Sequence, residues 1–290
     1  MLGVNFSPGP AMNPIELPVL ASDGHASCLR LHRSDAGAPG LLWLPALGVP
    51  AQKYDAFGRA LADAGIHCAV HEWRGIGTSS LRARRGIDWG YRELLQRDLP
   101  ASLAALDGTG RWYFGGHSLG GQFAAMAAAR QPAACAGLVL LATGVPHAST
   151  FSGRQRLGIG LFARLLPALT ALAGYYPGHR LGFAGREAGQ LMRDWAATVR
   201  SGRYLHYGDA TDLDSALAGL RKPALGIHMA HDWLVPRASL RALMSRLGGG
   251  EQRTELFDDA RLGTCADHFR WMRQPVAVAG AIADWIRANP

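Results

Sequence analysis

Short apolar runs alternate with amphipathic stretches along most of the chain. Two runs near the N-terminus, 14–21 and 26–33, are separated by a polar Ser-Asp-Gly-His stretch, which predicts an opening β-hairpin. Six more apolar runs have the length of strands and lie at 40–45, 66–73, 111–116, 135–143, 222–230 and 253–259. Stretches with helical periodicity separate most of these runs, so the pattern predicts successive β-α-β units.

The run at 135–143 is apolar at nearly every position, as expected for a strand covered on both faces of its sheet. Strands that alternate with helices form parallel sheets with helices packed on both sides. We therefore expect an α/β fold with a doubly wound, mostly parallel eight-stranded sheet. In such a sheet the reactive groups lie at the carboxyl ends of the strands.

The alternation stops between residues 146 and 220, where the sequence has helical signals but no clear strand. A long interval without strands inside an α/β pattern indicates an inserted subdomain. The sequence thus predicts a core formed by residues 1–145 and 221–290, with a helical lid inserted at 146–220.

The most apolar part of this insertion, 157–176, has the composition of a membrane span. Its leucines recur at helical spacing, at positions 161, 165, 169 and 172. Arg164 and Pro167 lie in its middle, and both are unfavourable in a helix that crosses a bilayer. We expect an amphipathic lid helix without stable membrane insertion, and peripheral attachment to a membrane through the leucine stripe is the alternative.

The stretch Gly116-His117-Ser118-Leu119-Gly120 matches the pattern G-x-S-x-G, between a predicted strand and an alanine-rich helix. In that setting the glycines allow a sharp reversal that leaves the serine exposed at the end of the strand. The following helix directs its N-terminus, which carries partial positive charge, at the same place. We interpret Ser118 as a nucleophile, and a glycine-rich turn with an incidental serine is the alternative.

Three stretches together resemble the α/β-hydrolase family. They are LPALGVPAQKYDAFGRALADAG, HEWRGIGTSS, and RDLPASLAAL followed by GGHSLGGQ. More narrowly, they resemble a bacterial subgroup of predicted α/β-hydrolases. The likeness is close over 40–145 and looser in the C-terminal third, and no motif of the insertion takes part in it. The resemblance implies a serine hydrolase with a Ser-His-Asp triad.

In this family the triad follows the chain order serine, acid, histidine. The loop MAHDWLVP resembles the family's acid loop, so the resemblance implies Asp232 as the acid, with Asp258 and Asp259 in reserve. His268 resembles the family's histidine and is the last histidine of the chain. Asp267 precedes it where relatives usually have glycine, and we expect a capping role for this aspartate.

The family also uses two backbone N–H groups as an oxyanion hole. The first is expected from Leu119, which directly follows the serine. The second is assigned by position to Leu47 in the loop PALGVP, with Ala46 as the alternative.

These assignments predict cleavage of a carboxylic ester or thioester through an acyl-enzyme intermediate, with no metal or organic cofactor. The apolar lid, with Tyr175, Tyr176 and Phe183, favours a small-molecule substrate with a medium or long acyl chain, or an aromatic ester. Alternatively, the leucine stripe only packs the lid onto the core. Acyl transfer to an acceptor other than water, and ligand binding without catalysis, are the other functions considered.

Composition narrows the partners and the location. The formal net charge is +8 over 290 residues, but the arginines are dispersed and Lys53 and Lys222 are the only lysines, so we expect no nucleic-acid site. The four cysteines are scattered and no secretory signal is evident, which favours a reducing, cytoplasmic location. His228 and His231 are three apart along a predicted strand and face opposite ways, which argues against a metal site.

Overall fold

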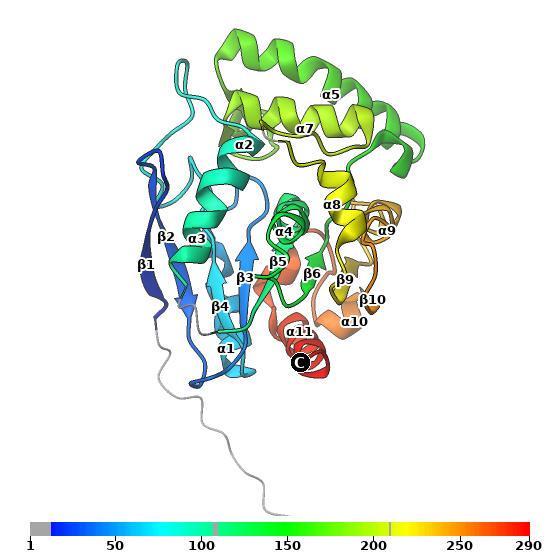
Figure 1. Cartoon of the computed structure of the whole chain (residues 1–290). Coiled ribbons are helices and arrows are strands. Elements are labelled where there is room, and N and C mark those ends of the chain that lie inside the picture. The colour runs from blue at the N-terminus through cyan, green and yellow to red at the C-terminus, as the bar shows by residue number, and fades with distance from the viewer. Residues whose placement is uncertain (1–12, 107–109, 209) are drawn as a thin grey trace, which may run out of the picture.

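The computed structural model describes residues 13–106, 110–208 and 210–290 (Figure 1). Its centre is an eight-stranded sheet of order β1-β2-β4-β3-β5-β6-β9-β10. The strands are β1 (Ile15–Leu20), β2 (Ala26–His32), β3 (Gly40–Leu44), β4 (His67–Val70), β5 (Trp112–His117), β6 (Leu138–Leu141), β9 (Ala224–Met229) and β10 (Gln252–Phe257). β2 is antiparallel to both its neighbours, whereas all pairs from β4 to β10 are parallel. The predicted fold class and the opening hairpin are confirmed.

Helices cover both faces of this sheet. Along β3, Leu42 and Leu44 pack into one apolar cluster, and Leu41 and Trp43 pack into a second cluster on the other face. The first face is covered by α3 (Leu99–Ala104), α4 (Leu119–Arg130), α8 (Leu213–Gly219) and α9 (Arg237–Met244), and the second by α1 (Asp55–Asp63) and α11 (Val276–Ala288). The short elements of the core are η1 (Ala51–Tyr54), α2 (Tyr91–Glu93), η2 (Leu94–Asp98), α10 (Asp259–Leu262) and η4 (Arg270–Arg273). The four cysteines are all free thiols.

A layer of helices lies across the carboxyl ends of the parallel strands (Figure 1). We call residues 153–201 the cap layer. It contains α5 (Gly153–Ala173), β7 (Tyr176–Pro177), α6 (Gly178–Leu181), β8 (Arg186–Glu187) and α7 (Gly189–Ser201), and η3 (Ala148–Thr150) precedes it. The small β7–β8 pair was not predicted from the sequence. The predicted insertion also includes α8, which packs on α4 beside the sheet.

Two leucines of the α5 stripe contact neither the core nor the pocket. The helix packs on α7 through Ala163, Leu166 and Thr170, which are buried. Leu161 and Leu165, which the stripe placed against the core or the substrate, are 57% and 56% exposed. Because α5 is apolar around most of its circumference, periodicity alone does not determine which face packs inward.

Candidate active site

Ser118 occupies the sharp turn between β5 and α4. Its backbone has φ 56° and ψ −123°, a strained conformation for a residue other than glycine. The Ser118 N–H donates to the carbonyl of Leu141 on β6, at 3.0 Å, and the Thr143 hydroxyl donates to the Ser118 carbonyl. These contacts to the neighbouring strand and to the residues beyond it hold the turn, so that the half-buried serine lines a pocket above the sheet.

The two glycines of the motif are required by close backbone contacts. A Cβ atom at Gly116 would lie 2.3 Å from the carbonyl carbon of Gly120. A Cβ atom at Gly120 would lie 2.0 Å from the carbonyl oxygen of Leu44 at the end of β3. Any larger residue would therefore push α4 away from the sheet and displace Ser118.

Asp232 and His268 form a fully buried pair. His268 Nδ1 lies 2.9 Å from Asp232 Oδ2, and both side chains are 0% exposed. The other carboxylate oxygen of Asp232 accepts the N–H groups of Leu234 and Val235 at 2.9 and 2.8 Å, which fixes its orientation. With Nδ1–H donated to the carboxylate, Nε2 carries the lone pair. Within the described residues Nε2 has no hydrogen-bond partner.

The structure brings this pair to the neighbourhood of Ser118. The rings of His268 and His117, the residue before the serine, lie 4.7 Å apart between centroids. Asp258 and Asp259, the reserve candidates for the acid, lie elsewhere. Asp258 accepts the Arg261 N–H at the start of α10, and Asp259 accepts the N–H of Ala266 at 2.7 Å.

Asp267 has the capping geometry that the sequence indicated. Its Oδ1 accepts the N–H groups of Phe269 and Arg270 at 2.9 and 2.7 Å, and its other oxygen forms an ion pair with Arg270. The aspartate thus turns away from the neighbouring His268 and stabilises the turn that carries it.

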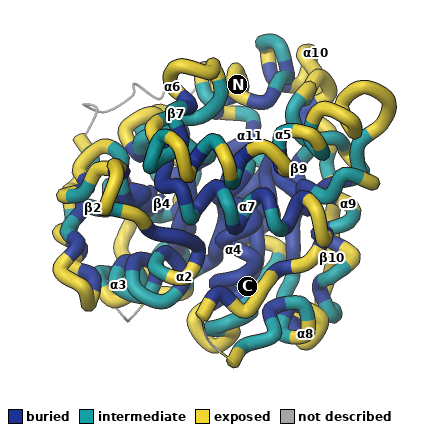
Figure 2. Tube along the Cα trace, turned by 90° about the horizontal axis from the view of Figure 1, so that it is seen from above, coloured by how far each residue is buried: buried dark blue, intermediate teal, exposed yellow. Residues whose placement is uncertain are grey.

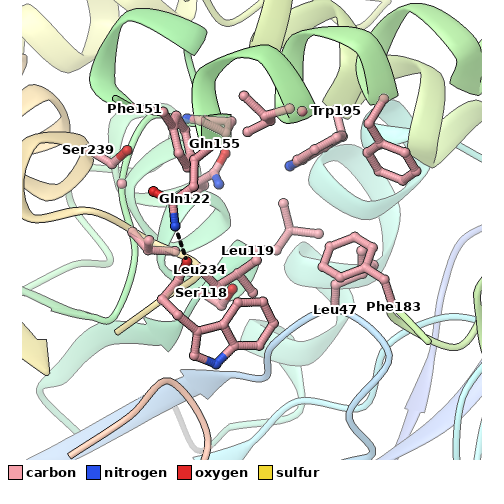
Figure 3. A pocket seen from close by; sticks show the side chains of 17 residues that line it. Leu47, Ser118, Leu119, Gln122, Phe151, Gln155, Phe183, Trp195, Leu234 and Ser239 are labelled. Carbon is pink, nitrogen blue, oxygen red and sulfur yellow. Dashed lines mark hydrogen bonds between the residues drawn. The ribbon is translucent and has the colours of Figure 1, made fainter. Parts of the chain in front are cut away.

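Leu119 and Leu47 both line the pocket beside Ser118 (Figure 3). Leu119 is the first residue of α4, so its N–H is not used within the helix. The N–H of Ala46, the alternative donor, is already donated to the Tyr54 hydroxyl at 2.9 Å. Within the described residues the Leu47 N–H has no acceptor. Leu119 and Leu47 are therefore two pocket-lining residues whose backbone N–H groups have no acceptor among the described residues.

The loop that carries Leu47 is held by the core and by the cap layer. The indole N–H of Trp73 donates to the Pro45 carbonyl at 2.9 Å. On the other side, a Cβ atom at Gly48 would lie 2.5 Å from the backbone nitrogen of Gly185, just before β8. Gly48 also has a φ of +75°, which favours glycine.

The pocket over Ser118 has a volume of about 410 Å³. Figure 3 shows Leu47 and Phe183 on one side of it, and Phe151 and Ser239 on the other. Its seventeen lining residues come from the core loops, from α4 and α9, and from the cap layer. They include no Asp, Glu, Lys, Arg or His side chain. The pocket is therefore suited to an apolar, uncharged group.

The remaining histidines show no arrangement for a metal ion. Among the described residues, no group of three or more His, Cys, Asp or Glu side chains is placed to hold one. His231 is exposed and lies 3.5 Å from Asp259, whereas His228 is half-buried on β9. His71 contacts the Ser102 hydroxyl at 2.9 Å, and burial lowers the pKa of its imidazole to about 4.

Comparison with known proteins assigns the chain to a family. Residues 44–262 match the family described as serine aminopeptidase, S33. The chain belongs to this family of α/β-hydrolases. The match spans the serine turn, Asp232 and the cap layer, and it ends shortly before His268.

Solved structures share the fold of this hydrolase at low sequence identity. A hydrolase from Pseudomonas aeruginosa PA01 is 24% identical, with a TM-score of 0.62 over 93% of this chain and 98% of the other. A thermophilic esterase from Thermogutta terrifontis is 18% identical (TM-score 0.61; 96% and 99% covered). A haloalkane dehalogenase from Bradyrhizobium elkani is 19% identical (TM-score 0.63; 94% and 97% covered). No curated protein matched the sequence.

Several residues of the hydrolase's pocket were not foreseen from the sequence. Gln122 lies one helical turn after Ser118, and this spacing of four could have indicated that it faces the same way. Its Oε1 is buried and has no partner within the described residues. Phe151, Trp195 and Trp233 enter the pocket from separate parts of the chain and carry no local signal. Phe183 lines the pocket, whereas Tyr175 and Tyr176 lie outside its lining.

Proposed function

We propose that this hydrolase cleaves carboxylic esters or thioesters with an apolar acyl group, using Ser118 as the nucleophile. The observation that carries the proposal is the position of Ser118, in a strained turn that opens into an uncharged pocket beside the buried His268–Asp232 pair. A serine hydroxyl is a weak nucleophile, and it needs a base that is held by an acid.

The reaction begins when Ser118 Oγ attacks the acyl carbon and His268 Nε2 takes the hydroxyl proton. Asp232 accepts the Nδ1–H bond throughout and stabilises the imidazolium that forms. The negative charge on the carbonyl oxygen is met by the N–H groups of Leu119 and Leu47. His268 then gives its proton to the leaving alcohol or thiol. Water attacks the acyl-enzyme with His268 as the base, which releases the acid and restores the serine.

The pocket favours an ester over a peptide. An aminopeptidase must hold the ammonium group of its substrate's N-terminus, and a buried cation needs a carboxylate partner. No carboxylate lines this pocket. The surfaces that it offers, such as Phe162, Phe183 and Ile159, suit an alkyl or aromatic acyl group.

The chemistry of serine also argues against dehalogenation. Displacement of a halide by Ser118 would form a serine ether, which has no carbonyl carbon for water to attack. The enzyme would be blocked after one turnover. An acyl group on the same oxygen forms an ester, which water can cleave with the help of His268.

The proposal is tested by labelling with a fluorophosphonate and by turnover of p-nitrophenyl esters of increasing acyl length. Wild-type protein should be labelled and should release the free acid, and Ser118→Ala and His268→Ala should lose both activities. Ser239→Ala is the matched control, because it removes the other serine hydroxyl of the pocket and should leave labelling of Ser118 intact. Absence of labelling in folded wild-type protein, or unchanged turnover in Ser118→Ala, would refute the assignment.

A further inference from the structure

The helix α5 has two different apolar faces. Ile159 and Phe162 on its inner face line the pocket over Ser118. The outer face carries four leucines, which we call the leucine ridge. They are Leu157, Leu161, Leu165 and Leu172, with exposed fractions of 75%, 57%, 56% and 79%. Isolated exposed leucines are ordinary on protein surfaces, but a row along one helix marks a surface that contacts something apolar.

The charge around this ridge has one sign. Arg154, Arg156 and Arg164 are exposed on α5 itself. At its C-terminal end, the exposed Arg85 donates from its guanidinium to the Leu172 carbonyl. The sequence contains no Asp or Glu from residue 108 to residue 186. An apolar face bordered by arginines is typical of helices that lie on anionic lipid.

Asp194, Asp88 and Glu187 lie in or beside the cap layer, and none offsets the arginines on the outer face. Asp194 of α7 is 9% exposed and accepts the Tyr91 N–H at 2.8 Å. Asp88 is paired with Arg193 of α7 at 2.8 Å. Glu187 of β8 is 3% exposed and accepts the Gly185 N–H. The outer face of the cap layer is therefore positively charged, in agreement with the net charge of the whole chain.

The packing of α5 indicates how it would meet a membrane. The helix has 21 residues, and an 18-residue window within it has a mean hydropathy of 1.4, so by length and composition it could cross a bilayer. Its inner face, however, packs on α7, and Arg200 of α7 donates to the Ala163 carbonyl at 2.8 Å. A helix that keeps one side on the protein can bury its other side by lying along the interface.

We propose that the leucine ridge and the arginines beside it dock this hydrolase on the surface of an anionic phospholipid membrane, with α5 lying along that surface. Figure 1 places α5 at the outer limit of the molecule, and Figure 2, which views the protein from that side, shows exposed positions recurring on the cap helices. The docking uses the outer face of α5 and does not depend on the chemistry of Ser118.

A membrane fits this surface better than a second copy of the chain. In a symmetric dimer the same patch meets itself, so the ridge arginines would face one another. The ridge has no carboxylate to pair with them, and like charges brought together across an interface oppose association. Phospholipid headgroups with net negative charge supply the missing counter-charge, and their acyl chains accept the leucines.

The location of the pocket agrees with this arrangement. Trp233 lines the pocket yet is 59% exposed, so it marks the rim of the opening. Its carbonyl accepts the side-chain amide of Gln155 in the first turn of α5, at 3.0 Å. The rim thus adjoins the N-terminal end of the leucine ridge, and tryptophan is a residue that favours the membrane–water interface. Docking through the ridge brings the opening next to the lipid from which an apolar substrate would come.

The test is flotation with vesicles of phosphatidylcholine alone or mixed equally with phosphatidylglycerol. Ser118→Ala protein is used beside wild type, so that binding is measured without turnover. Both should float with the anionic vesicles at low salt, and less so at high salt, because the arginine contribution is screened. Leu161→Ser/Leu165→Ser should reduce partitioning by about tenfold or more, because the apolar area buried in the lipid is lost.

Two matched controls distinguish the effect of the leucine ridge from the effect of losing any exposed leucine or any positive charge. Leu20→Ser/Leu256→Ser changes leucines that are 70% and 49% exposed on β1 and β10, and it should float like wild type. Arg154→Gln/Arg156→Gln should weaken binding to anionic vesicles. Arg253→Gln/Arg287→Gln removes the same amount of charge outside the cap layer, in β10 and α11, and should not weaken binding. The ridge variants should retain turnover of a soluble ester.

Flotation that is absent, or that the ridge variants leave unchanged, would overturn the proposal. A dimer that forms in solution and is lost in Leu161→Ser/Leu165→Ser would overturn it in favour of a second copy. Loss of esterase activity in Ser118→Ala with retained flotation would support both proposals. Unchanged turnover in Ser118→Ala would contradict the proposed function alone, and unchanged flotation of the ridge variants would contradict membrane docking alone.

Discussion

The hydroxyl of Tyr54 joins the loop before Leu47 to His117, the residue before Ser118. It accepts the Ala46 N–H at 2.9 Å and lies 2.9 Å from Nδ1 of His117. Burial raises the pKa of the Tyr54 phenol and lowers that of the His117 imidazole well below its ordinary value, so the phenol keeps its proton and the imidazole stays neutral. The phenol therefore donates to Nδ1, and one buried hydrogen-bond network links the loop of Leu47 to the turn of Ser118.

Replacement of Tyr54 by phenylalanine should impair catalysis more than binding. The change leaves the Ala46 N–H and His117 Nδ1 without partners, at a cost of about 1–3 kcal/mol in the free energy of unfolding. The freed Ala46 loop should misplace the Leu47 donor and lower kcat by roughly tenfold to hundredfold, with little change in KM. Ester kinetics and urea unfolding measure the two effects. Tyr113→Phe is the control, because its hydroxyl contacts the Asn289 carbonyl at the far end of β5, and kcat should be retained.

Asp232→Asn should leave the fold intact and lower kcat by about 10⁴, because an amide in place of the carboxylate favours the wrong tautomer of His268. Ester hydrolysis, with circular dichroism as a check on folding, tests this. Asp267→Asn and Asp259→Asn are matched controls that alter neighbouring carboxylates without contact to His268. A larger loss in Asp259→Asn than in Asp232→Asn would show that the acid has been assigned wrongly.

Stability should fall as the pH rises from about 4.5 to 7 because of Glu187. Burial raises the pKa of this carboxyl from 4.5 to about 7, despite the hydrogen bond from the Gly185 N–H. The folded state thus holds a proton that the unfolded chain has already released in this range. The contribution is full below pH 4.5, and its loss by pH 7 costs on the order of 3 kcal/mol. Glu187→Gln should remove this slope, which is read from urea unfolding at a series of pH values as the difference from wild type.

Asp98 should be among the most sensitive positions for stability. Burial raises its pKa, but the hydrogen bonds from His25 and Arg74 outweigh burial and hold the pKa below its ordinary value. Arg74 is 4% exposed and also binds Asp23. Asp98→Ala leaves Arg74 with an incomplete set of partners and should lower the free energy of unfolding by about 3–5 kcal/mol. Asp284→Ala, at an exposed ion pair with Arg287, should cost less than about 1 kcal/mol.

The parts of this hydrolase that sequence could predict are those whose signals are local. The strand, serine turn and helix around Ser118 are adjacent in the chain, and their glycines have backbone reasons that a motif records. The fold class followed from the alternation of strands and helices. Asp232 and His268 were reached through the order of the triad in a resembling family, and their contact spans 36 residues.

The parts that escaped prediction depend on tertiary contacts. Nothing near Tyr54 indicates His117, 63 residues away, or tells that the hydroxyl takes the Ala46 N–H. The burial of Glu187 depends on how the short β7–β8 pair folds. The sequence left open which way the leucines of α5 face, because a helix that is apolar on both sides gives the same periodicity in either orientation.

Neighbouring positions of α5 separate two properties that are often linked in an enzyme. Leu161 is exposed while Phe162 lines the pocket, and Leu165 is exposed while Leu166 is buried. A substitution that reshapes the pocket and one that alters the outer surface can therefore lie at adjacent positions, and neither changes the surface that the other affects. Mutations can therefore change the preference for an acyl group and the contacts of the outer surface independently, and a designer could adjust either property alone.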